Sequence, residues 1–211
     1  MNSPLLRQDR RFRGLRLLSR LALLFACLFA AASADGLPPA SLERLLQSAL
    51  EQTHLTRYYD PAYVKLAYPG GDVPIERGVC TDVVIRAFRA AGIDLQQLVH
   101  EDMARHFDRY PRRWGLKRPD PNIDHRRVPN LETFFTRHGM KQADLSPGSF
   151  RRGDLVVWRL PGGLPHIGII ATDPSREARF PPCIHNVGAG TRLEDVLTAW
   201  PITGRYRYPF K

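Results

Sequence analysis

The chain has 211 residues, a formal net charge of +10, 43% hydrophobic residues and 25% charged residues. These values are typical of one globular domain that is long enough to bury a real core. The basic residues are scattered rather than gathered into one patch, which argues against nucleic acid as a partner.

The first 34 residues have the pattern of a secretory signal peptide. Six arginines precede a short apolar run at residues 21–31, and Ala32-Ser33-Ala34 follows as a small-residue cleavage site. The run is short for a membrane-spanning helix, so an uncleaved N-terminal anchor is the alternative. Because the run continues past Cys27, we do not expect lipidation there. We predict one domain over residues 35–211, located in the periplasm or cell envelope.

The first part of this domain has helical periodicity. We predict a helix beginning at Ser41, a loop with Tyr68 at residues 68–74, and further helices at residues 78–92, 95–107 and 130–138. Residues 110–129 are polar, rich in proline and irregular. A loop of that length inside a domain is more often functional or disordered than neutral.

Cys80 lies in the first turn of the predicted helix at residues 78–92. Unpaired backbone N–H groups and the positive end of the helix dipole would stabilise a thiolate there. Asp82 follows in the same turn, where a negative charge suits the dipole. The alternative is that Cys80 is a small buried residue that begins a core helix.

The last part of the chain has the alternation and turn signals of strands. We predict strands at residues 153–158, 166–171, 183–187 and 203–208, and a short helix at residues 193–200. Helices followed by consecutive strands predict an α+β fold with a mostly antiparallel sheet.

One cysteine at a helix start and later strand-mounted histidines suit a Cys–His nucleophile pair. His166 follows a Gly/Pro turn, a rigid mount for a general base. Either His185 or Asn186 could orient His166, because alternation places these two neighbours on opposite faces of their strand. A disulfide between Cys80 and Cys183 is the competing possibility in an oxidising compartment.

Zinc bound by Cys80, His166 and His185 is a further alternative. The sequence has no close ligand pair of the CxxC or HExxH kind, so we expect no metal and no cofactor.

The motifs resemble those of NlpC-type cell-wall peptidases. The shared order is a Tyr-x-Gly-Gly loop, a cysteine helix, Gly-Asp-Leu-Val, His-Ile-Gly-Ile and Ile-His. The resemblance implies a papain-like fold in which Cys80 is the nucleophile, His166 the base and His185 the third residue. It also implies that Tyr68 lies near the oxyanion site.

Residues 78–84, residues 122–131 and the His166 strand resemble more closely the bacterial family known as domain of unknown function 1287. The chain departs from the NlpC pattern at Val79, which replaces an aspartate, and at Asp82, which replaces a glycine. We expect Asp82 to contact the substrate and to change what is accepted near the nucleophile. Residues 94–139 are also extra, and we expect them to cover the cleft, restrict the substrate or add His125 or Asp124 as a contact.

The resemblance therefore implies an exported cysteine hydrolase that acts on an amide bond of peptidoglycan or its peptide fragments. We expect a monomer that meets the membrane only through an uncleaved signal peptide. The alternatives are a non-catalytic cell-envelope binding module on the same fold, and an acyltransferase that uses the same Cys–His pair.

Overall fold

The computed structural model describes residues 39–175 and 180–211. The predicted signal peptide and Cys27 lie outside these residues. The described residues contain four α-helices before the main sheet: α2 (Ala40–Leu55), α3 (Cys80–Ala90), α4 (Leu95–Arg105) and α5 (Val128–Arg137). Within this part of the chain no helix is long and apolar enough to span a bilayer.

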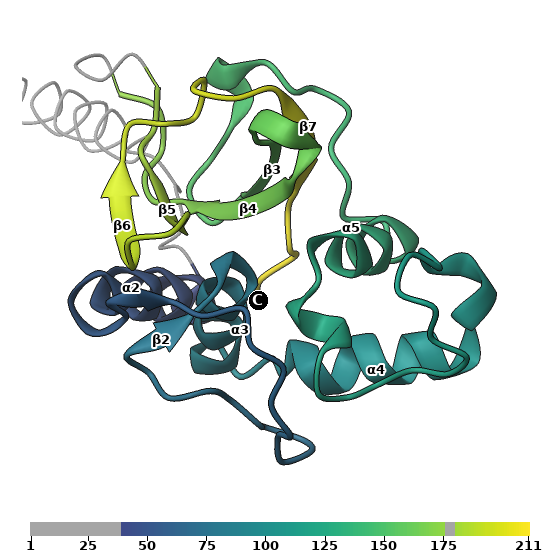
Figure 1. The fold of residues 1–211 in the computed structure, drawn as a ribbon. Helices are drawn as coiled ribbons and strands as arrows, with labels where there is room; N and C mark the ends of the chain where they lie inside the picture. Colours follow the sequence, from purple (N-terminus) through teal and green to yellow (C-terminus); the bar gives the residue numbers. More distant parts are fainter. Residues whose placement is uncertain (1–38, 176–179) are drawn as a thin grey trace, which may run out of the picture. The chain divides into compact units, whose positions relative to one another are not determined.

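A five-stranded sheet follows the helices, in the order β6-β5-β4-β3-β7. Its strands are β3 (Leu155–Arg159), β4 (Pro165–Ile170), β5 (Cys183–Asn186), β6 (Thr191–Glu194) and β7 (Ile202–Tyr206). Every neighbouring pair in this sheet is antiparallel. This arrangement confirms the predicted α+β class, with N-terminal helices before an antiparallel sheet (Figure 1).

The predicted helix at residues 193–200 is wrong. Thr191–Glu194 forms strand β6, which pairs with β5 from Asn186↔Thr191 to Cys183↔Glu194. Leu197 then packs into a core, and no helix is assigned at these residues. The tertiary pairing with β5 decided the conformation, because a run this short has little helical stability of its own.

The two faces of the sheet bury two separate apolar clusters. Residues alternate along β3 and β4, so that Val157 and Ile167 join the cluster formed with the helices. Val156, Trp158 and Ile170 join a second cluster. Cys80 belongs to the first cluster and Cys183 to the second.

Helix α3 lies in the middle of the fold and is buried on almost every side. It packs against α2 and against strands β4 and β5, and its buried residues run from Cys80 to Phe88 (Figure 1). The buried Arg86 is neutralised by Asp72, at 2.8 Å from Nε to Oδ2, and donates to the carbonyl oxygens of Val73 and Arg77. A helix buried all round keeps its first turn in a fixed position.

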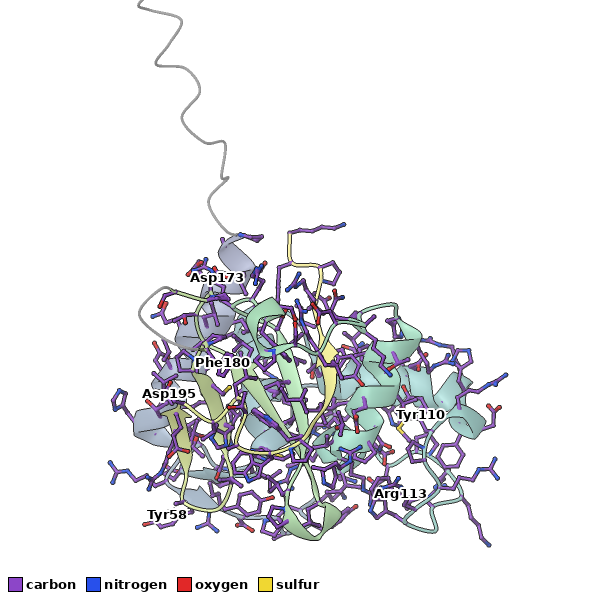
Figure 2. All side chains as sticks on the ribbon, turned by 90° about the horizontal axis from the view of Figure 1, so that it is seen from above. Tyr58, Tyr110, Arg113, Asp173, Phe180 and Asp195 are labelled. Atoms are coloured by element: carbon purple, nitrogen blue, oxygen red, sulfur yellow. The ribbon has the colours of Figure 1, made fainter. Side chains whose placement is uncertain are left out.

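The extra segment at residues 94–139 is ordered around a buried carboxylate. Asp102 accepts hydrogen bonds from Tyr110 Oη at 2.6 Å and Arg137 Nε at 2.8 Å, which tie α4 to α5. Burial opposes ionisation, yet these donors hold the pKa of Asp102 at about 2. Tyr110 and Arg113 lie in this part of the fold, on the side away from Asp195 (Figure 2).

Candidate active site

Asp82 fixes the start of the cysteine helix. Its Oδ2 accepts the backbone N–H of Val79 at 2.7 Å, which closes the first turn around Cys80. Gly78 precedes this turn with φ 156°, and a Cβ there would lie 2.9 Å from Asp82 Oδ2. Only glycine therefore allows the carboxylate to approach the backbone so closely.

Asp82 is also the partner of a buried arginine. Arg126 Nε donates to Oδ1 at 2.8 Å, and Nη2 donates to Oδ2 at 2.9 Å. Arg126 comes from the 3-10 turn η2 (Asp124–Arg126) and also donates to the carbonyl oxygen of Ala62. Both Asp82 oxygens are thus occupied by protein donors, so the structure gives Asp82 a structural role where we expected a substrate contact.

The Cys80 thiol is neutral in this environment. Burial raises the pKa of Cys80 to about 11, the backbone N–H of Ile167 acts against the rise, and the charge of Asp82 adds to it. This direction is opposite to the one expected from the helix dipole alone. Cys80 is only 5% exposed, so the free-energy cost of desolvating its thiolate exceeds the stabilisation that the helix terminus provides.

His166 and His185 form a buried pair on the second face of the sheet. His166 Nε2 lies 3.0 Å from His185 Nδ1, and the His166 ring stacks on Trp158 with centroids 5.5 Å apart. Trp200 covers both imidazoles, with each centroid separation 6.0 Å. Burial and, to a smaller extent, the neighbouring His185 together lower the pKa of His166 to about 3, so this ring is neutral.

Glu194 lies next to the histidine pair, on the far side of His185. Its Oε2 lies 3.1 Å from His185 Nε2, at an angle that does not form a hydrogen bond. Burial lowers the pKa of His185, and the nearby carboxylate acts in the opposite direction. Sequence reasoning missed Glu194 because it assigned this residue to a helix. Residues 191–194 do not alternate between buried and exposed positions, so no local pattern in the sequence indicated the strand.

Asn186 has a different role from His185. Its Nδ2 donates to the carbonyl oxygen of Gly78 at 3.1 Å, and its Oδ1 accepts the N–H of Gly188. Asn186 therefore ties β5 to the segment before α3. Of the two candidates that the sequence left open, His185 is the one in contact with His166.

The nucleophile candidate and the base candidate lie on opposite faces of the sheet. Cys80 packs in the same buried cluster as Ile167, the residue after His166, on the first face. His166 turns toward the second face. Among the described residues no hydrogen bond joins the Cys80 thiol to either imidazole.

Cys80 opens onto a pocket of about 200 Å³. Tyr59 and Trp114 line it, together with Pro165 of β4 and the residues at 126–129 of the extra segment. Tyr59 belongs to β1 (Tyr58–Tyr59), which pairs in parallel with β2 (Arg77–Gly78) just before α3. Burial, then the charges of Cys80 and Asp82, raise the pKa of Tyr59 to about 12.

Tyr68 and His125 lie elsewhere. Tyr68 packs against the His100 ring, with centroids 5.0 Å apart, and it does not line the pocket of Cys80. His125 is buried, and burial followed by the charges of Arg126 and Arg89 lowers its pKa to about 4. Tyr59 takes the place beside Cys80 that we expected for Tyr68, because strand β1 brings it to Gly78.

Both cysteines in the described residues are free thiols. Cys183 lies in the second apolar cluster and Cys80 in the first. The proposed disulfide between them is therefore not part of this structure. No three His, Cys, Asp or Glu side chains of residues 39–175 and 180–211 are arranged as a metal site.

The fold and the site together define an α+β protein with a cysteine at a helix start and a buried histidine pair on the adjoining sheet. Residues 46–208 match the family model described as Domain of unknown function (DUF1287). The chain belongs to this family.

Two further proteins are similar to the chain. It is 50% identical over 199 residues to Escherichia coli K12 "Uncharacterized protein YijF", covering 90% of this chain and 97% of the relative. A Staphylococcus aureus crystal structure described as similar to lipoprotein, NLP/P60 family, gives a TM-score of 0.41 at 12% identity. That comparison covers 88% of this chain and 47% of the other, so the chain spans about half the length of that protein.

Proposed function

We propose that the protein is an exported cysteine hydrolase that cleaves an amide bond in cell-wall peptide. The observation that carries the proposal is the packing of Cys80, at the start of α3, in the same buried cluster as Ile167 of β4. Ile167 is the residue after His166, and His166 is itself in contact with His185. A nucleophile, a base and an orienting group are the three parts that this chemistry needs.

The reaction begins from a neutral thiol and a neutral imidazole. As the substrate enters the pocket, His166 takes the thiol proton and Cys80 attacks the carbonyl carbon. The backbone N–H of Cys80 donates to the oxyanion. The C–N bond breaks when His166 returns the proton to the amine. Water, deprotonated by His166, then releases the acyl group from sulfur.

This mechanism requires the His166 ring, which stacks on Trp158 on the face of the sheet opposite to Cys80, to move to the thiol when substrate is bound. Catalytic hydrogen bonds are often long in free enzymes and tighten in the substrate complex. The pocket provides room for that complex, and Tyr59 on its wall is a neutral hydroxyl donor that could contact the substrate. The export and the peptidoglycan substrate of the proposal come from the N-terminal pattern and from the motif resemblance.

The test compares the chain without residues 1–34 with its Cys80→Ala variant on purified peptidoglycan. We expect the parent to release soluble peptides, detected by liquid chromatography and mass spectrometry, and Cys80→Ala to release none. Cys183→Ala is the matched control, because it removes the other buried free thiol outside the site, and it should keep activity. Equal release by the parent and Cys80→Ala would contradict the proposal.

The burial of Cys80 favours a second candidate, a cell-envelope binding module without catalysis. A thiol with a pKa of about 11 and no hydrogen bond to His166 in the described residues is what such a module could retain. Sedimentation with insoluble peptidoglycan separates the two. Binding by both the parent and Cys80→Ala, with no release of peptide by either, would identify the module.

A further inference from the structure

The contact between His166 and His185 admits only one donor. A neutral imidazole has one N–H and one acceptor nitrogen, so one of the two facing nitrogens must carry the proton. If His185 Nδ1 donates, His166 Nε2 is the acceptor. If His166 Nε2 donates, His185 Nδ1 is the acceptor. The 3.0 Å separation fits both cases, so the choice depends on the far side of His185.

Glu194 faces that far side. Its carboxylate lies 3.1 Å from His185 Nε2 and carries only acceptor atoms when ionised. A proton on Nε2 is attracted to it, whereas a lone pair on Nε2 would be repelled. The Glu194 side chain is 37% exposed, so water screens its charge in part, but His185 Nε2 itself is buried away from water.

The geometry points to Glu194 as a positioning residue that sets the tautomers of both histidines. With the proton on His185 Nε2, Nδ1 accepts the N–H of His166 Nε2. His166 then keeps its lone pair on Nδ1. This is the only nitrogen of the pair that is left to accept a proton from a substrate or a thiol.

The catalytic part of this inference rests on the proposed hydrolase function. There, the base that takes the Cys80 proton is His166 Nδ1. The opposite tautomer would present a protonated Nδ1 to the thiol and could not accept its proton. Glu194 itself touches neither Cys80 nor the pocket beside it.

The first experiment measures the tautomers directly, without any need for activity. Long-range ¹H–¹⁵N spectra of ¹⁵N-histidine-labelled protein near neutral pH report which ring nitrogen carries hydrogen. We expect His185 protonated at Nε2, and His166 protonated at Nε2 with a free Nδ1. Signals are assigned by His166→Gln and His185→Gln. The opposite assignment in the parent protein would overturn the inference.

Two substitutions then test the role of the carboxylate. Glu194→Ala should populate the second tautomer in both rings, and Glu194→Gln should do so partly, since an amide can donate or accept. Glu101→Gln, on α4, is the control and should change neither ring. Circular dichroism checks that each variant is folded. Unchanged tautomers in folded Glu194→Ala would overturn the inference.

Activity provides the last readout. We expect kcat of Glu194→Ala to fall by about 10²-fold with little change in KM, at the low end of what general acid–base catalysis contributes. Shifted tautomers together with an inactive parent protein would leave the positioning role standing and would remove the hydrolase proposal. If the parent protein is active and its histidine tautomers are unchanged in Glu194→Ala, the positioning role alone would be removed.

Discussion

Asp82 links the backbone before Cys80 to a side chain 44 residues further on. It accepts from Val79 N–H and from two nitrogens of Arg126, and both charged side chains are almost fully buried. A buried pair contributes modestly while it is intact, but removing one partner leaves an uncompensated charge. The backbone conformation just before α3 therefore depends on Arg126, a residue of the extra segment.

Replacing Asp82 by Asn should destabilise the protein by about 3–5 kcal/mol, because Arg126 is left charged and buried. Urea denaturation gives the free energy of unfolding. The control is Glu132→Gln, whose pair with Arg159 is partly exposed and should cost below about 1 kcal/mol. The double variant Asp82→Asn/Arg126→Gln should lose less than the sum of the single variants. A loss within about 1 kcal/mol for Asp82→Asn would contradict this account.

The residues that carry the site were only partly predictable from sequence. Cys80 and His166 could be predicted from the sequence, because a helix start and a strand after a turn are local patterns. Arg126 is not visible, because nothing local pairs it with Asp82. Tyr59 is brought beside Gly78 by a two-residue parallel pairing that carries no periodicity. Burial, which reverses the expected pKa shift of Cys80, is likewise a property of the packed structure.

At the scale of elements, the turn before β6 is held against the end of α2. Gly190 has φ +84°, and a Cβ there would lie 2.6 Å from the carbonyl oxygen of Thr56. The next residue, Thr191, donates its N–H to that same oxygen at 2.8 Å. The strand that carries Glu194 is thus placed by backbone contacts that exclude any side chain at Gly190.

A side chain at Gly190 would cost free energy in two ways, through the positive φ and through a steric clash, and a matched substitution separates them. Gly139 has φ +71°, and a Cβ there would meet nothing within 4 Å, so Gly139→Ala should cost about 1–2 kcal/mol from backbone conformation alone. Gly190→Ala should cost about 1–3 kcal/mol more, because it adds a steric clash. Thermal and urea unfolding measure both. Equal losses of unfolding free energy in the two variants would show that the backbone at the end of α2 moves to relieve the clash without an energetic cost.

Helices and strands were mostly predictable, and the exception has a physical cause. The residues at 80–91 and 153–171 have periodicities that match α3, β3 and β4. The segment at 193–200 contains apolar residues at a spacing that suits a helix, but strand β5 offers β6 a hydrogen-bonding edge. Whether these residues form a helix or a strand depends on the pairing with β5, and the local sequence contains no information about that partner strand.

At the scale of the whole molecule, the described residues bury neutral histidines. The pKa values are about 3 for His166 and about 4 for His125, against about 6.5 in an unfolded chain. Between these values the unfolded state binds protons that the folded state does not. Stability is therefore fully present above about pH 6.5 and falls as the pH decreases toward 4.

We expect the free energy of unfolding to drop between about pH 7 and pH 5, by up to about 1.4 kcal/mol per pH unit for each histidine. Urea denaturation at several pH values measures this slope. His166→Gln should reduce the slope, whereas His54→Gln, at an exposed position, should leave it unchanged. A free energy of unfolding that stays constant or increases as the pH is lowered through this interval would mean that the buried rings are not held neutral.

The alternation of β4 has a consequence for how such a site can evolve. His166 and Ile167 are neighbours that face opposite sides of the sheet, one toward the tryptophans and one toward the cysteine helix. A slip of β4 by one residue would expose the core side chains and exchange the places of imidazole and isoleucine together. The packing of the core therefore also fixes the face of the sheet on which His166 lies. We expect the spacing between the Gly/Pro turn and β4 to tolerate substitutions but not insertions of a single residue.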